Sequence, residues 1–289
     1  MPTSLTHAAN KRGIAYMVCA LAVLILLDTC SKFVVQRLPV TLAVWSRYAG
    51  HMLLVFAFAY PSVRAGLWRT KNLKVQILRG LMLATMSLFY FAAFKTLPLA
   101  TATALLFLTP ILITIWAKLF LGETITRGGW LAVFVGFVGV LIICRPGAGL
   151  DLQGVVFALC AALANSVYQT LTRRAAIGDA PETQLFFTGL VGAVVLTAGL
   201  PVWWSPIAEN TTAMTWLAFA LLGVFGAAGH YLLIKAYQAA SASTLAPWMY
   251  MQMLLAIALG WWVFGDKPDA IAVAGMVLIA VAPRLSVLR

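Results

Sequence analysis

The charged side chains that could do chemistry in this chain lie inside stretches of apolar residues. Asp28 is followed one helical turn later by Lys32, and the next apolar stretch carries Arg47 and then His51. Ionisable residues are costly in such surroundings and usually face a bundle interior or a water-filled cavity. Asp28 and Arg47 are expected at similar depth on neighbouring helices. They could bind the two charges of a zwitterion, or they could form a salt bridge that ties the two helices together.

Histidine adds the chemistry of proton transfer, because its unperturbed pKa lies near neutrality. His51 could therefore relay protons, or it could be a hydrogen-bonded packing residue, and the packing role is favoured. His230 could contact the solute or serve in close helix packing, and packing is favoured there too. It lies beside Gly223, Gly226 and Gly229, whose spacing predicts a flat helix face for close packing.

Neutral polar side chains occupy further apolar stretches. Asn165 and Gln169 share one helix face, where a polar stripe either lines a solute path or joins helices. Thr109 and Gln252 hold matching positions of an internal repeat, and the proline after Thr109 removes a helical hydrogen bond and frees a carbonyl. Trp248 could contact a solute or serve as an interfacial or packing aromatic.

The composition argues against a water-soluble domain. The 289 residues are 63% hydrophobic and 10% charged, whereas soluble domains carry about a quarter charged residues. Lipid removes this conflict, and each span then needs about 20 mostly apolar residues. The net charge of +12 does not indicate nucleic-acid binding, because the basic residues are scattered between apolar stretches. The four cysteines form no CxxC pair, so we expect no disulfide framework, metal site or cofactor.

Ten apolar stretches predict ten transmembrane helices, which pair their own backbone groups within hydrocarbon. Prolines at the junctions, such as Pro39, Pro98 and Pro181, are typical of helix ends and starts. The expected spans are Ile14–Gln36, Val40–Tyr60, Val75–Leu97, Ala100–Leu121, Arg127–Cys144, Leu152–Ala175, Thr183–Val202, Met214–Tyr237, Ala242–Phe264 and Ala270–Pro283.

The basic residues predict the orientation of these spans, because Lys and Arg accumulate in cytoplasmic loops. With both termini in the cytoplasm, that side receives Lys11, Arg12, Arg64, Arg69, Lys71, Lys74, Lys118, Arg127, Arg173, Arg174, Lys235, Arg284 and Arg289. The other side receives Arg37, Arg145 and Lys267 in its loops, with Lys32 and Lys95 near helix ends. We therefore expect an N-in/C-in, multi-pass protein of the inner (plasma) membrane.

An internal repeat divides the ten spans into two sets of five. Ala93–Ala100 resembles Ala236–Ser243, and Leu121–Glu123 aligns with Phe264–Asp266. Because five is odd, the two halves must cross the membrane in opposite orientations. Inverted repeats are typical of secondary transporters, whose binding site lies near the midplane between the repeats.

The repeated motif resembles the EamA domain. The residues that carry the resemblance are Ala93–Ala100, Thr109, Pro110, Leu121–Glu123, Gly136 and Gly139, with a weaker copy in the second half. The resemblance implies two EamA repeats, residues 1–146 (helices 1–5) and 147–289 (helices 6–10), as in the drug/metabolite transporter superfamily. Members of that superfamily include exporters of amino acids and of other metabolites.

We therefore predict an all-α membrane protein that exports small metabolites, with neutral or aromatic amino acids as the first choice, by alternating access. The first alternative is a carrier of drugs, other metabolites or nucleotide sugars. A channel or an intramembrane enzyme is the less favoured alternative. No HExxH, GxSxG or Walker motif supports an enzyme. The expected partners are a small-molecule substrate and membrane lipid, without nucleic acid. The candidate substrate-binding residues are Asp28, Arg47, His51, Thr109, Asn165, Gln169, Trp248 and Gln252.

Overall fold

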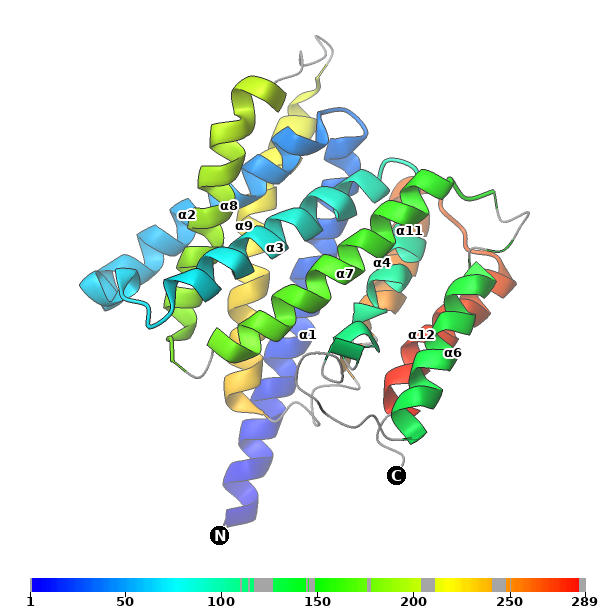
Figure 1. Cartoon of the computed structure of the whole chain (residues 1–289), viewed down its shortest axis with the longest axis horizontal. Helices are drawn as coiled ribbons and strands as arrows, with labels where there is room; N and C mark the ends of the chain where they lie inside the picture. Colours follow the sequence, from blue (N-terminus) through cyan, green and yellow to red (C-terminus); the bar gives the residue numbers. More distant parts are fainter. Residues whose placement is uncertain are drawn as a thin grey trace.

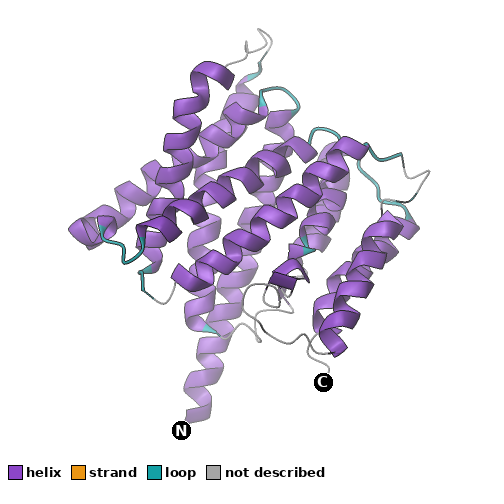
Figure 2. Ribbon diagram, in the orientation of Figure 1, coloured by secondary structure: helices purple, strands orange, loops and turns teal. Residues whose placement is uncertain are grey.

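In the computed structural model, the described residues form helices joined by loops and turns, and none of them lies in a strand (Figure 2). The described residues are 2–109, 111–113, 115–116, 127–143, 145, 149–175, 178–203, 211–240, 248–249 and 251–285. Pro110, Lys118, the motif Leu121–Glu123 and Arg289 lie outside these residues.

Figure 1 shows the described helices and their order along the chain. They are α1 (Pro2–Val35), α2 (Val40–Val63), the 3-10 helix η1 (Arg64–Trp68), α3 (Leu73–Ala93), α4 (Leu99–Leu106), α6 (Arg127–Ile143), α7 (Leu152–Ala175), α8 (Pro181–Trp203), α9 (Ala213–Ala239), α11 (Met251–Phe264) and α12 (Ala270–Leu285). Among the described residues, α1, α2, α3, α7, α8 and α9 are long and apolar enough to cross a membrane, and shorter apolar helices accompany them.

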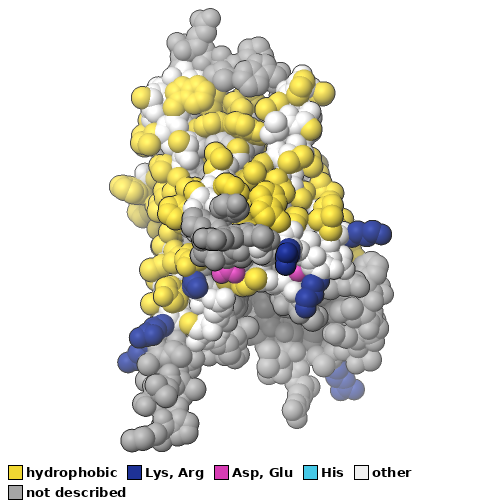
Figure 3. All heavy atoms as spheres, turned by 90° about the vertical axis from the view of Figure 1, so that its left-hand side faces the viewer, with side chains coloured by type: hydrophobic (Ala, Val, Ile, Leu, Met, Phe, Trp, Pro, Cys, Tyr) yellow, Lys and Arg dark blue, Asp and Glu magenta, His cyan; other side chains and the backbone are white. Residues whose placement is uncertain are grey.

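The outer surface of the bundle is apolar. Trp262 is 84% exposed and Phe58 is 79% exposed, which water would penalise and lipid accommodates. In Figure 3, hydrophobic side chains cover the upper and middle part of the face that is shown, and Lys and Arg lie toward the lower end. That lower end is the one where Figure 1 places the N-terminus.

Local chemistry sets several helix boundaries. α3 begins after Asn72, whose side chain accepts a hydrogen bond from the Val75 N–H, and Thr212 caps α9 in the same manner. Such caps satisfy N–H groups that have no partner within the helix. α11 ends where Gly265 adopts a positive φ of 73° and its N–H bonds to the Trp261 carbonyl, a left-handed C-cap that favours glycine.

The largest differences from the expected boundaries are in α1 and α4. α1 starts at Pro2 instead of Ile14, because the length of an apolar stretch predicts the membrane span and not the full helix. α4 ends at Leu106 instead of continuing to Leu121. The proline at position 110 provides no N–H for the Leu106 carbonyl, and the Thr109 hydroxyl bonds to that carbonyl instead, at 2.7 Å.

Helix packing occurs mainly between the first and second halves of the chain, and the contacts come in matching pairs. α1 packs along α9 as α3 packs along α7, and α2 contacts α9 as α3 contacts α8. Two further pairs, α2 with α8 and α6 with α12, each join helices at equivalent places in the two halves. Gly13 at the base of α1 lies against Ala240, and Gly154 at the start of α7 lies against Leu97.

Glycines allow the closest helix crossings. A Cβ at Gly223 of α9 would lie 2.5 Å from the Cα of Gly50 on α2. α6 and α12 cross in the same way, since a Cβ at Gly139 would lie 2.9 Å from the carbonyl oxygen of Gly275. Small residues let helices approach closely, and dispersion contacts then replace the missing hydrophobic drive between helices in lipid.

The α2–α9 crossing should not tolerate a methyl group at Gly223. We expect Gly223→Ala to lower stability by about 1–3 kcal/mol, as overpacking does in well-packed interiors, because backbone lies opposite the new methyl group. Gly226→Ala on the same helix is the control, since its Cβ would meet no heavy atom closer than 3.6 Å. Thermal unfolding in detergent measures both variants. Equal melting temperatures for the Gly223→Ala and Gly226→Ala proteins would contradict a tight α2–α9 crossing at Gly223.

Candidate functional site

Asp28 and Gln252, two of the predicted residues, come together between the halves. Asp28 is a buried residue of α1, and its Oδ2 accepts a hydrogen bond of 3.4 Å from the Gln252 Nε2 on α11. The hydroxyl of Tyr90 on α3 also interacts with the Asp28 carboxylate. A carboxylate inside the bundle is therefore held by an amide and a hydroxyl.

Arg47 is buried on α2, and its guanidinium also contacts polar side chains other than carboxylates. Its Nη1 donates to the Ser87 hydroxyl at 2.7 Å, and its Nη2 lies 3.4 Å from the Nε2 of His230 on α9. The guanidinium also lies 5.8 Å from the ring centre of Phe91 and 5.5 Å from that of Tyr48, within the range of cation–π attraction.

Asp28 and Arg47 do not form the salt bridge that the sequence left open. In the described part of the chain, the pairs within 4.0 Å are Lys32–Asp266 and Arg145–Asp269. Asp28 and Arg47 still lie close enough to attract each other electrostatically. Two opposite charges thus occupy one interior region, each bonded to other side chains.

His51 and His230 lie near Arg47. The Nε2 of His51 lies 3.3 Å from the Leu185 carbonyl oxygen on α8. Its ring centre is 6.3 Å from that of His230, in an edge-to-face arrangement. His51 therefore has a packing partner and also belongs to a polar cluster, so the proton-relay role stays a prediction.

A second polar contact links α4 with α7. The Asn165 Nδ2 donates to the Thr109 hydroxyl oxygen at 3.1 Å, which places these two predicted residues together beside the interruption of α4. Gln169, one turn after Asn165, and Trp248, near the start of α11, have exposed side chains. The structure therefore groups Asp28 with Gln252, Arg47 with His51 around His230, and Thr109 with Asn165.

Sequence reasoning missed two side chains that hold these groups and one further buried charge, Arg79. Ser87 and Tyr90 lie one turn apart on α3 and contact Arg47 and Asp28 respectively. Their spacing within an apolar stretch was a signal that could have identified them. Arg79 was a stronger signal, because it is an ionisable residue inside the predicted span Val75–Leu97.

Arg79 is buried near the start of α3, where its side chain contacts α7 and α8. Its Nε donates to the Thr172 hydroxyl at 2.8 Å, and its Nη1 donates to Gln76 Oε1 at 2.7 Å and to the Gln184 carbonyl at 3.0 Å. These three bonds engage the Nε and Nη1 groups and tie α3 to α7 and α8, which is the pattern of a structural residue.

Asp179, in the connection between α7 and α8, extends this network. Its carboxylate accepts hydrogen bonds from the Thr70 hydroxyl at 2.6 Å, the Lys71 N–H at 2.8 Å and the Gln76 amide at 2.7 Å. Partial burial raises the pKa of Asp179, but these hydrogen bonds and the charge of Lys71 outweigh it and hold the pKa below its usual value. The carboxylate therefore ties the start of α3 to the α7–α8 connection.

Comparisons with known proteins identify the family. The sequence pattern of the EamA-like transporter family matches this chain twice, over residues 11–145 and 152–288. The chain belongs to the EamA-like transporter family. It is a multi-pass protein of the bacterial inner membrane and a membrane transporter, not an enzyme, and it contains two copies of the EamA domain.

Several EamA-like relatives with named solutes resemble the whole chain. The S-adenosylmethionine uptake transporter of Rickettsia bellii is 27% identical over 87% of this chain and 85% of its own length. The pseudopaline exporter CntI of Pseudomonas aeruginosa is 27% identical over 94% of each chain. The riboflavin transporter of Vibrio cholerae is 27% identical over 85% of this chain and 82% of its own.

A solved structure shows the same fold as this EamA-like chain. It is described as "Crystal structure of protein", and it superposes with a TM-score of 0.66 at 20% sequence identity. The match covers 98% of this chain and 97% of the other.

The Asp179 network makes stability depend on pH. A carboxyl group whose folded pKa is lowered stabilises the fold above its unfolded pKa and loses that contribution as the pH falls through the folded value. We expect Asp179→Asn to lower the melting temperature at pH 7. The difference from the unsubstituted protein should shrink below about pH 4, where carboxyl groups become protonated. A constant difference from pH 7 to pH 3 would contradict this account.

Proposed function

We propose that this chain exports neutral or aromatic amino acids across the bacterial inner membrane as a secondary transporter. The observation that carries the proposal is the pair of buried, oppositely charged residues Asp28 and Arg47, which share one interior region without pairing to each other. An amino acid carries both complementary charges. Its ammonium would meet Asp28 and its carboxylate would meet Arg47.

The partners of the two charges favour binding over a purely structural role. Gln252 donates to Asp28 through a long hydrogen bond of 3.4 Å, which an ammonium group would replace with a stronger, charge-assisted bond. Arg47 bonds to a hydroxyl and lies beside an imidazole nitrogen. A carboxylate is the ligand that an arginine fork recognises best, and its arrival would offset the cost of burying the guanidinium.

The proposed transport mechanism is alternating access between two inverted repeats, residues 1–146 and 147–289, with five membrane spans in each. The matching helix contacts support this division, because the packing of α1 against α9 is repeated in the packing of α7 against α3. The shorter apolar helices beside the six long ones supply the remaining spans of the proposed ten. Rocking of one repeat against the other would expose the charged region to each side in turn.

The proposed orientation places both termini in the cytoplasm. Figure 1 shows the N-terminus and the end of α12 at the same end of the bundle. Basic side chains gather toward that end on the face in Figure 3, as the positive-inside rule requires of the cytoplasmic side.

The names of the relatives support a carrier of small metabolites and also define the alternative. Their names state different solutes, and one is an uptake transporter while another is an exporter. S-adenosylmethionine itself carries the ammonium and carboxylate of an amino acid, whereas riboflavin does not. A carrier of another metabolite or of drugs is therefore the second candidate, and the solute and direction are what the experiment must decide.

Efflux from proteoliposomes tests the proposal directly. We expect the purified protein to release labelled neutral and aromatic amino acids with only the solute gradient imposed, and this efflux should saturate and be inhibited by other amino acids. Empty liposomes and liposomes loaded with labelled riboflavin are the controls. Amino-acid efflux no faster than that of empty liposomes, with or without a proton gradient, would overturn the amino-acid assignment.

Substitution of each charge tests its assigned role. We expect Asp28→Asn and Arg47→Gln each to weaken apparent affinity about 100-fold, since loss of one partner from a buried charge pair costs 2–5 kcal/mol or more. Arg37→Gln is the matched control, because Arg37 is exposed and stacks on Phe33 at the end of α1. An Arg47→Gln protein that folds and transports with unchanged affinity would rule out carboxylate binding there.

A further inference from the structure

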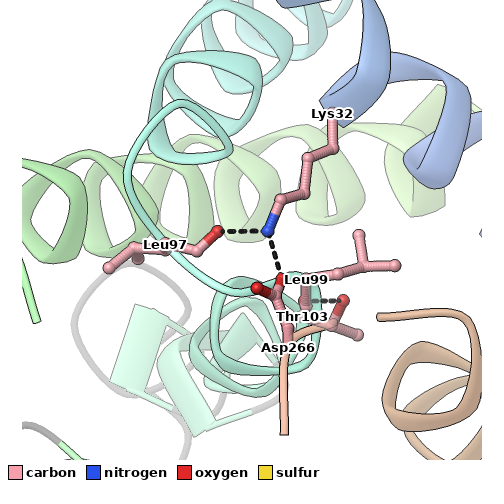
Figure 4. A network of polar contacts seen from close by, with 5 residues as sticks. All are labelled: Lys32, Leu97, Leu99, Thr103 and Asp266. Carbon is pink, nitrogen blue, oxygen red and sulfur yellow. Dashed lines mark hydrogen bonds and ion pairs between the residues drawn. The ribbon is translucent and has the colours of Figure 1, made fainter. Parts of the chain in front are cut away.

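Lys32 is a buried ammonium at the end of the bundle opposite the termini (Figures 1 and 4). Its Nζ forms an ion pair with Asp266 and donates a 3.0 Å hydrogen bond to the Leu97 carbonyl oxygen. It also lies 4.8 Å from the ring centre of Phe264. Figure 4 shows the side chain reaching from α1 to both oxygen acceptors.

The three partners come from three separate segments. Lys32 belongs to α1, Leu97 to the connection before α4, and Asp266 to the connection between α11 and α12. Lys32 and Leu97 therefore lie in the first half of the chain, and Asp266 lies in the second. The Lys32 ammonium group therefore joins the two halves at this end of the bundle.

The backbone holds Asp266 in place for this contact. Gly265 adopts its positive φ immediately before Asp266, and the Asp266 N–H returns to the Gly260 carbonyl at 3.0 Å. The carboxylate is thus presented by a fixed turn and not by a freely moving loop. An ion pair of this kind forms and breaks with the approach of α1 to the end of α11.

Two connections link the ion pair with the candidate binding region. Asp28 lies one turn before Lys32 on α1. Asp28 contacts Gln252 on α11, and Lys32 contacts Asp266, the second residue after the end of α11. In addition, the Tyr90 hydroxyl interacts with Asp28 and lies 3.2 Å from the Thr103 hydroxyl, which donates to the Leu99 carbonyl at 2.8 Å. Figure 4 shows this last bond beside the ion pair.

We propose that the Lys32–Asp266 ion pair, together with the Leu97 carbonyl, is a latch that closes this end of the transporter and opens once in each transport cycle. The inference rests on the proposed alternating-access function. Separation of α1 from α11 breaks the latch and the Asp28–Gln252 bond together. A solute ammonium that replaces Gln252 at Asp28 removes a polar contact between these helices and so favours opening.

Arg145–Asp269 provides a matched control at the same end. This ion pair of 2.8 Å joins the end of α6 to the start of α12. Both side chains are more exposed than those of the latch, at 26% and 55%, and exposed pairs contribute little to stability. α6 and α12 also pack along their length, so this contact is not expected to open.

Reagent access to Thr103 tests the latch without any substrate. Thr103 is buried beside the latch, and Thr103→Cys would be placed in a protein whose four native cysteines are replaced by serine. A charged methanethiosulfonate reagent is added to this protein in nanodiscs. We expect Lys32→Gln to raise the labelling rate about tenfold, as a shift of about 1.4 kcal/mol toward the open state does. The exchanged pair Lys32→Asp with Asp266→Lys should restore slow labelling.

Two controls separate gating from general loosening. Arg145→Gln should leave the labelling of Thr103→Cys unchanged. A second reporter, Thr172→Cys near the other end of the bundle, should label at the same rate with and without Lys32→Gln. The latch is overturned if Lys32→Gln leaves the labelling of Thr103→Cys unchanged, or if it accelerates both reporters equally.

Covalent closure of the latch provides an independent test. Lys32→Cys with Asp266→Cys, bridged by a bifunctional methanethiosulfonate, should stop amino-acid efflux, and a reductant should restore it. The bridged pair Arg145→Cys with Asp269→Cys should keep its activity. Full efflux through the bridged latch would overturn the inference. Failure of the unsubstituted protein to move amino acids would instead count against the proposed function, and the labelling rates would still decide the latch.

Discussion

A charge inside a lipid-embedded bundle must find its partners within the protein, because hydrocarbon cannot solvate it. The structure meets this constraint in three different ways. Arg79 donates short hydrogen bonds to a hydroxyl, an amide oxygen and a backbone carbonyl. Lys32 pairs with a carboxylate from the other half of the chain. Asp28 and Arg47 contact uncharged polar groups, and each has a contact as long as 3.4 Å.

The two halves of the chain share their helix packing but differ in their polar side chains. Helix contacts repeat between the halves, as in the packing of α1 with α9 and of α7 with α3. The side chains at matching positions differ, since Gln169 stands where the first half has Asp28. Gly50 lies where α2 crosses α9, and Val191 lies where α8 meets α3. The polar groups are therefore distributed unequally over a nearly symmetric frame, with both Asp28 and Arg47 in the first repeat.

Contact between α1 and α11 connects the interior charges with the end of the bundle. Asp28 and Lys32 are one turn apart on α1. Asp28 contacts Gln252 on α11, and Lys32 contacts Asp266 in the turn that follows α11. A rigid helix transmits displacement along its axis, so in the proposed mechanism solute binding at Asp28 and closure at Lys32 both depend on the separation of α1 and α11. Coupling of this kind needs only a two-state contact between packed elements.

Much of this architecture follows from the sequence alone. Apolar length predicts the helices, the repeated motif identifies the EamA family, and the rarity of charges inside spans draws attention to Asp28 and Arg47. Helical periodicity shows which residues share a face, but it carries no information about the helix that lies opposite. Only the tertiary structure therefore decided that Asp28 meets Gln252, that Lys32 meets Asp266 and that α4 stops at Leu106. Those partners are far apart in the chain and come together only when the two halves pack.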